Sequence, residues 1–178
     1  MEEICLKPIG FVRHEKDEEL RRRWEGVEGE IEILPEYEEG LKGIEGFSHI
    51  ILIAYLHLVE GEKRRVLKVK PRRLRNFGIS IDDLPEVGVF SSDSPHRPNP
   101  IAISIVKLKG VQGRVLEVEG LDLYSGTPIL DIKPYGYERR IEEIRVPWWS
   151  DEVKRRVEEK MGREKKRGKA DESPDLHP

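Results

Sequence analysis

The stretch "SPHRPNPIAISIV", residues 94–106, places a proline-rich polar segment directly before a strongly apolar run. Proline fixes its own φ angle and restricts the residue before it, so three prolines within six residues stiffen the backbone. The segment is either a rigid corner of a barrel or a preorganised polar rim, whose side chains lose little entropy on binding a ligand. The residues by themselves favour neither interpretation.

Alternation of apolar and polar residues, the period of a β-strand, dominates the first three quarters of the chain. So many short strands predict a mainly β fold, a small β-barrel with a few peripheral helices and a C-terminal helix. The apolar phase changes within residues 101–108, which predicts a bulge or a sharp bend near Ile105. The predicted strands span residues 4–13, 30–34, 48–58, 66–69, 87–91, 101–108, 114–119 and 129–132.

Helices are predicted over residues 17–23, 35–41 and 151–161, the last with Ser150 as N-cap and Gly162 as its stop. The residues after Gly162 include almost no apolar side chain, so burial cannot offset the entropy of ordering them. We therefore predict a barrel domain over residues 1–140, a C-terminal extension with a helix over residues 141–162, and a flexible charged tail over residues 163–178.

Charge is abundant but balanced, because 32 Lys and Arg residues oppose 35 Asp and Glu residues for a net charge of -3. The total therefore says nothing about nucleic acid. One local exception is the basic segment from Lys63 to Arg75, "KRRVLKVKPRRLR", which contains eight cations and no acidic residue. It is either a solvated edge or a contact for phosphates.

Several classes of protein are disfavoured by the sequence. Cys5 is the only cysteine, so an intramolecular disulfide is impossible. The chain shows no N-terminal apolar signal and no apolar run long enough to cross a bilayer, so a cytoplasmic protein is expected. Neither a GxGxxG nor a Walker motif is present, which argues against a Rossmann-type site, and the histidines lack the spacing of zinc ligands, so no metal is predicted.

Four ordered motifs resemble the TsaA-like/TrmO family: "IGFVR" at 9–13, "GIEGFSHIILIAYLH" at 43–57, "VGVFSSDSPHRPNPIAIS" at 87–104 and "LEVEGLDLYSGTPILDIKPY" at 116–135. The resemblance implies a small non-Rossmann β-barrel that uses S-adenosyl-L-methionine. It further implies N6-methylation of threonylcarbamoyladenosine next to the anticodon of tRNA. Members are typically homodimers with cofactor sites close to the subunit interface, so tRNA and a second copy of the chain are the implied partners.

The same resemblance implies which residues bind the cofactor. They come from a segment before the second predicted strand, from the end of the long apolar strand, from the proline-rich motif and from a "DLxDGTP"-like element. By number they are Arg23, Trp24, Glu25, His57, Leu58, Asp93, Arg97, Asn99, Ile103, Asp122, Leu123, Tyr124 and Ser125.

The sequence departs from the family pattern most seriously at Asp93, where the family has an arginine. An arginine can pair with the methionine carboxylate of the cofactor, whereas an aspartate repels it. Either the affinity for the cofactor is weaker, or Arg97 or Arg23 takes over that contact. Ser125 also replaces the usual aspartate. An alternative to the methyltransferase is therefore a non-catalytic regulatory module that binds S-adenosyl-L-methionine or RNA. His96, Asp122 and His57 are conceivable proton acceptors, and the sequence selects no catalytic base among them.

Overall fold

The computed structural model describes residues 3–171, with side chains described as far as residue 163. These residues fall into two compact units. The first comprises the chain up to Leu67 together with Gly88–Arg140, and the second comprises Lys68–Val87 together with the chain from Ile141 onward. Each unit has a hydrophobic core of its own.

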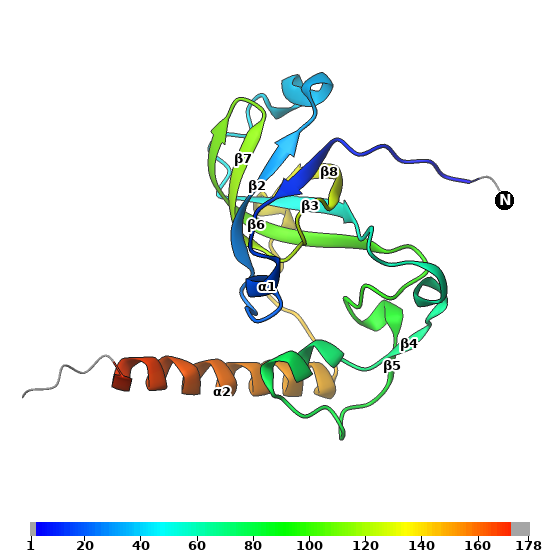
Figure 1. Ribbon diagram of the computed structural model, residues 1–178, viewed down its shortest axis with the longest axis vertical. Coiled ribbons are helices and arrows are strands. Elements are labelled where there is room, and N and C mark those ends of the chain that lie inside the picture. The colour runs from blue at the N-terminus through cyan, green and yellow to red at the C-terminus, as the bar shows by residue number, and fades with distance from the viewer. Residues whose placement is uncertain (1–2, 172–178) are drawn as a thin grey trace, which may run out of the picture. The chain divides into compact units, whose positions relative to one another are not determined.

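The first unit is a closed six-stranded barrel, which confirms the predicted fold class (Figure 1). Neighbouring strands follow the order β1-β2-β7-β6-β3-β8, and every pair is antiparallel. The strands are β1 (Gly10–Arg13), β2 (Val27–Ile33), β3 (His49–Tyr55), β6 (Ile101–Gln112), β7 (Val115–Leu121) and β8 (Pro128–Pro134).

Alternating burial along the strands fills the barrel with one face of each strand. In β3, Ile50, Leu52 and Ala54 are fully buried, and in β6 Ser104 and Val106 point inward. The isoleucines at 101, 103 and 105 are exposed on the outer face of β6. The predicted bulge near Ile105 is therefore wrong, because the pairing of β3 with β6 runs unbroken through Ile105 and the irregularity lies between Leu108 and Gly110, against β7.

The remaining elements of the first unit are short. The predicted helix 17–23 is reduced to α1 (Asp17–Leu20), and the predicted helix 35–41 is the 3₁₀ helix η1 (Pro35–Leu41). The strand predicted over residues 4–13 begins only at Gly10, and the one over residues 87–91 is β5 (Val87–Gly88) followed by the 3₁₀ turn η4 (Val89–Ser91). Two further 3₁₀ turns are η2 (Gly61–Arg65) and η5 (Tyr137–Arg139).

The second unit contains the 3₁₀ helix η3 (Arg72–Phe77) and the helix α2 (Trp148–Asp171), and β4 (Lys68–Val69) forms a two-stranded sheet with β5. Leu74, Ile81 and Leu84 pack with Val157 of α2 in its core. Arg156 reinforces this contact, since its guanidinium donates to Ser80 O at 2.8 Å and to Asp83 at 3.0 Å.

The C-terminal helix was predicted in kind but not in extent. It begins at Trp148, so Ser150 lies inside it rather than at its N-cap, and it continues past Gly162 to Asp171. The first residues of the predicted tail are thus helical, and residues 172–178 lie outside the described residues. Within residues 3–171 no helix is long and apolar enough to cross a membrane.

Candidate functional site

Six strand ends lie at one end of the barrel, and the chain segments joined to them there form what we call the site rim. The strand ends are the last residues of β1, β3 and β7 and the first residues of β2, β6 and β8. The antiparallel registers require this arrangement, because the end of β3 pairs with the start of β6 at Tyr55 and Ile101, and the start of β2 pairs with the end of β7 at Val27 and Leu121. Chain ends that pair in this way lie on the same edge of the barrel.

The site rim holds the predicted cofactor residues, which are distant in sequence. Those before β2 are Arg23, Trp24 and Glu25; those after β3 are His57 and Leu58; those before β6 are Asp93, Arg97 and Asn99; and those between β7 and β8 are Asp122, Leu123, Tyr124 and Ser125. Ile103 is the third residue of β6. The registers thus place the strand ends that flank these four segments on one edge of the barrel.

The segment 23–26 lies against the end of β7. Gly26 has a φ of 76°, and a Cβ atom there would be 2.7 Å from Gly120 C and 2.7 Å from Leu121 O. Only glycine fits both the left-handed backbone and this close approach of two chains. Gly26 therefore joins the predicted segment 23–25 to the Asp122–Ser125 loop.

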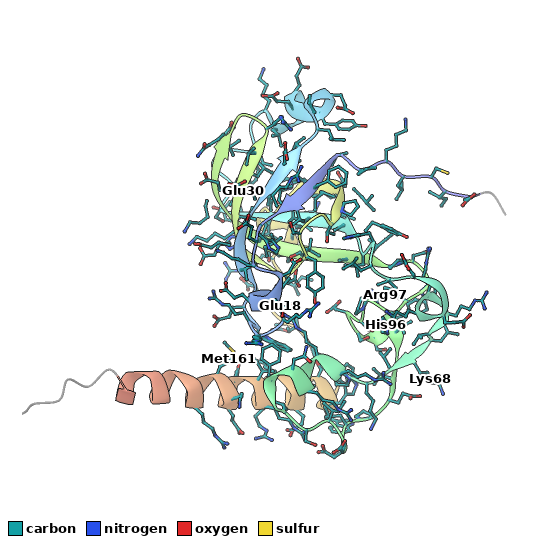
Figure 2. All side chains as sticks on the ribbon, in the orientation of Figure 1. Glu18, Glu30, Lys68, His96, Arg97 and Met161 are labelled. Carbon is teal, nitrogen blue, oxygen red and sulfur yellow. The ribbon has the colours of Figure 1, made fainter. Side chains whose placement is uncertain are left out.

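The loop before β6 is fixed by Arg97 (Figure 2). Its Nη2 donates to Val89 O and to Ser92 O, both at 2.6 Å. These bonds pin the η4 turn, which presents Phe90 with 84% of its surface exposed. Arg97 Nη2 is therefore used to hold the loop, and only the other nitrogens of the guanidinium can donate to a cofactor.

Two buried nitrogens at the site rim have no hydrogen-bond partner among the described residues: Nε of Arg97 and Nδ1 of His57. The Leu56 N–H donates to Pro100 O at 2.7 Å, so His57 follows directly on a residue bonded to the proline-rich loop. A buried polar group without a partner costs about 1–3 kcal/mol. Both atoms suit a site that receives polar groups of a ligand.

The residues that could compensate for Asp93 have other contacts. Asp93 itself is exposed, and Arg23 donates to Glu19 at 2.7 Å. The hydrogen bond to Glu19 raises the pKa of Arg23. Of the two arginines, Arg97 is the one with a buried, unpaired N–H, so it is the better candidate to face a carboxylate.

Ile103 lies on an apolar outer face of the barrel wall, which we call the isoleucine face. On β6 it consists of Ile101, Ile103 and Ile105, and the last two are 71% and 53% exposed. Their partners in register on β3 are Tyr55, Ile53 and Ile51. This surface borders the site rim because Ile101 begins β6.

The basic segment is divided between the two units. Lys63, Arg64 and Arg65 are exposed on η2 in the first unit, where Arg65 pairs with Glu62 at 3.0 Å. Arg72, Arg73 and Arg75 lie on η3 in the second unit. Arg75 pairs with Asp82 at 3.4 Å.

The sequence did not point to His14 and Asp17, which also lie at the site rim, after β1. The His14 ring contacts Leu123 O at 2.8 Å, and Asp17 accepts the Ser125 N–H at 2.9 Å. Their partners lie 109 and 108 residues away in the chain, so no local pattern could have indicated them.

Residues 19–139 match the family model described as the tRNA-methyltransferase O N-terminal domain. The chain belongs to the TrmO family. A probable S-adenosyl-L-methionine-binding protein of Pyrococcus abyssi is 38% identical over 84% of this chain and 78% of its own length. The human tRNA (adenine(37)-N6)-methyltransferase is 41% identical over 55% of this chain, but over only 20% of its own length.

The TrmO fold is also known from crystal structures. TrmO from P. aeruginosa superimposes with a TM-score of 0.59 and 29% identity, over 83% of this chain. The chain covers 62% of that protein, so part of the solved structure has no counterpart in the match.

Proposed function

We propose that this chain binds S-adenosyl-L-methionine at the site rim and transfers its methyl group to N6 of threonylcarbamoyladenosine, next to the anticodon of tRNA. The observation that carries the proposal is the pair of buried, unpaired nitrogens, Arg97 Nε and His57 Nδ1, which belong to the residues predicted to bind this cofactor. The names of the relatives support it, as does the position of that group on one end of the barrel. We assign the activity to the barrel unit, which comprises the chain up to Leu67 together with Gly88–Arg140, rather than to the continuous domain 1–140 that the sequence predicted.

The chemistry that the cofactor supplies when bound is an electrophilic methyl group on a sulfonium. The chain contributes positioning, because transfer requires the acceptor nitrogen in line with that methyl group. Prolines 95, 98 and 100 stiffen the loop before β6, and Arg97 ties it to the η4 turn. Arg97 Nε is available to donate to a carboxylate or a hydroxyl of the bound molecule.

The acceptor nitrogen must also lose a proton. Among the three predicted acceptors, Asp122 accepts a hydrogen bond from Ser104 Oγ at 2.6 Å and keeps an exposed surface. His57 Nδ1 is buried and unpaired. The proton can pass to Asp122, to His57 or to water, and the proposal is the same for each of these acceptors.

For the RNA, we propose that the exposed cations of the basic segment from Lys63 to Arg75 contact phosphates. Neutralising Lys63, Arg64 and Arg65 together should weaken tRNA binding and make it less dependent on salt, because fewer counterions are released. Binding isotherms at several salt concentrations measure this.

The central experiment has two steps. Calorimetric titration with S-adenosyl-L-methionine tests the cofactor site, and a labelled methyl group then reports transfer to tRNA with and without the threonylcarbamoyl modification. Transfer to modified tRNA alone is the expected result. Binding without transfer to any tRNA would contradict the methyltransferase.

The second candidate function is a non-catalytic module that responds to S-adenosyl-L-methionine, and exposed Asp93 favours it. Asp93→Arg restores the family residue. If the natural protein has lost a carboxylate contact, the affinity of this variant rises about tenfold, or about 1.4 kcal/mol. Methyl transfer that appears only in the variant would identify the natural chain as the binding module.

We also propose that two copies pair through the isoleucine face. Its six residues expose a continuous apolar surface on two neighbouring strands, and such patches mark interaction sites on soluble proteins. A dimer formed there would bring the partner close to the site rim, since Ile103 belongs to both.

A further inference from the structure

The loop Asp122–Ser125 is held at each of its four residues by a side chain from another part of the barrel unit. Ser104 binds Asp122, and the Arg21 guanidinium lies 5.9 Å from the centre of the Tyr124 ring. The other two residues, Leu123 and Ser125, are held by His14 and Asp17. A loop that only connected two strands would not need a side-chain contact at each of its residues.

His14 is buried, with only 2% of its side chain exposed, and both ring nitrogens are bonded. Nδ1 accepts the Lys16 N–H at 3.0 Å, so this nitrogen carries a lone pair. In a neutral ring the proton is then on Nε2, which donates to Leu123 O at 2.8 Å. The network therefore selects one tautomer and directs its N–H at the backbone of the loop.

Asp17 completes the contact from the first turn of α1. Its Oδ1 accepts the Ser125 backbone N–H at 2.9 Å, and the backbone N–H of His14 donates to Ser125 Oγ at 3.4 Å. A carboxylate that accepts a backbone N–H makes a stronger bond than a neutral acceptor would. The loop is thus gripped at one carbonyl, one amide and one hydroxyl by a single four-residue segment.

We propose that His14 and Asp17 are positioning residues that set the geometry of the Asp122–Ser125 loop for the cofactor. The inference rests on the proposed function, because it assumes that this loop contacts S-adenosyl-L-methionine. A site of this kind needs its first contacts held by a second set of side chains, since a loop that fluctuates must be ordered when the ligand binds. Neither residue needs to touch the ligand.

Two matched pairs of variants test the proposal in the full chain. His14→Gln places an amide N–H near the position of Nε2 and so keeps the bond to Leu123 O. His14→Asn places its oxygen near the position of Nδ1, so it keeps the hydrogen bond from the Lys16 N–H but loses the one to Leu123 O. Asp17→Asn retains an acceptor for the Ser125 N–H, and Asp17→Ala removes it. The Asp17 pair differs mainly in the contact with the loop, whereas the His14 pair exchanges that contact for the bond from Lys16.

The readouts are the dissociation constant for S-adenosyl-L-methionine, amide hydrogen exchange of residues 122–126 without ligand, and the thermal unfolding midpoint. His14→Asn and Asp17→Ala should weaken binding about fivefold to tenfold and speed exchange in the loop, because each loses one hydrogen bond to it. His14→Gln and Asp17→Asn should stay near the wild type. The midpoint identifies a variant that fails to fold.

Failure of this inference and failure of the proposed function give different results. If the wild type binds the cofactor and all four variants bind it equally well, the positioning role is overturned and the proposed function stands. If the wild type does not bind S-adenosyl-L-methionine, the proposed function fails. Hydrogen exchange then decides alone: faster exchange in His14→Asn than in His14→Gln supports the grip on the loop, and equal exchange overturns it.

Discussion

Gly26 is the residue at which backbone geometry most directly controls the site. Gly26 and Gly126 have nearly the same φ, 76° and 78°, but only Gly26 lies against another chain segment. Gly126→Ala should lower the free energy of unfolding by about 1 kcal/mol, the cost of a left-handed alanine. Gly26→Ala adds a clash at 2.7 Å with the backbone of Gly120, so a loss of about 3 kcal/mol is expected.

Urea unfolding measures both glycine variants. Equal losses would show that the contact between the 23–26 segment and β7 relaxes without cost. Cofactor affinity should also fall in Gly26→Ala more than in Gly126→Ala, because the clash displaces the start of the Asp122–Ser125 loop.

The residue types alone predicted which loops carry polar side chains of the candidate site. They did not predict the side-chain contacts that fix those loops. The stiffness of the loop from Ser94 to Pro100 could be predicted from the sequence, because proline restricts its own backbone. The two hydrogen bonds that Arg97 donates at the η4 turn could not be predicted. Nor could the contacts of His14 and Asp17 with the Asp122–Ser125 loop. Such contacts depend on segments that meet only in the folded barrel.

At the scale of elements, alternation predicted the strands well and their inner face less well. The isoleucines of β6 look like core residues by composition, yet they face outward while Ser104 and Val106 face inward. The closure of the six strands into a barrel, together with the burial of Ser104 and Val106, shows which face of β6 is enclosed. The mistaken bulge at Ile105 arose because both faces of this strand are apolar.

The ion pairs of helix α2 predict how the stability of its unit depends on pH. Hydrogen bonds from Arg155 and then Arg156 lower the pKa of Glu152 from 4.5 to about 2. A carboxyl whose pKa is lower in the folded state stabilises the fold above its unfolded pKa, and this stabilisation disappears as the pH falls through the folded pKa. The helical signal and thermal midpoint should therefore fall between about pH 4.5 and 2, and less steeply in Glu152→Gln.

Glu158→Gln serves as the control on the same helix, since Glu158 pairs with Lys154 at 3.8 Å on an exposed surface. It should follow the pH profile of the wild type. Circular dichroism at a series of pH values measures all three proteins. Identical slopes for the wild type and Glu152→Gln would show that the network of Glu152 and Arg156 does not contribute to the stability of its unit.

On the scale of the whole molecule, the main feature that the sequence did not reveal is the second unit. Residues 68–87 leave the barrel and share a core with the C-terminal helix. Leu74 and Val157 meet there although long stretches of barrel sequence separate them. Contacts between such distant segments leave no period in the sequence, whereas each strand of the barrel shows its own alternation of buried and less buried residues.

The isoleucine face gives the last prediction, which concerns assembly. If two copies pair there, a charge introduced on this face must lose its hydration against apolar side chains, which is unfavourable. Ile105→Asp should therefore convert a dimer to a monomer in light scattering after gel filtration, with its fold retained because Ile105 is outside the core. Leu67→Asp is the matched control, since Leu67 is 60% exposed and lies outside the isoleucine face. A wild type that is monomeric at all concentrations, or two variants that dissociate equally, would exclude this face as the interface.

The same variant links assembly to the cofactor, because Ile103 lies both on the isoleucine face and among the predicted cofactor residues. The monomeric Ile105→Asp variant should therefore bind S-adenosyl-L-methionine more weakly than the wild type. Calorimetry measures this difference.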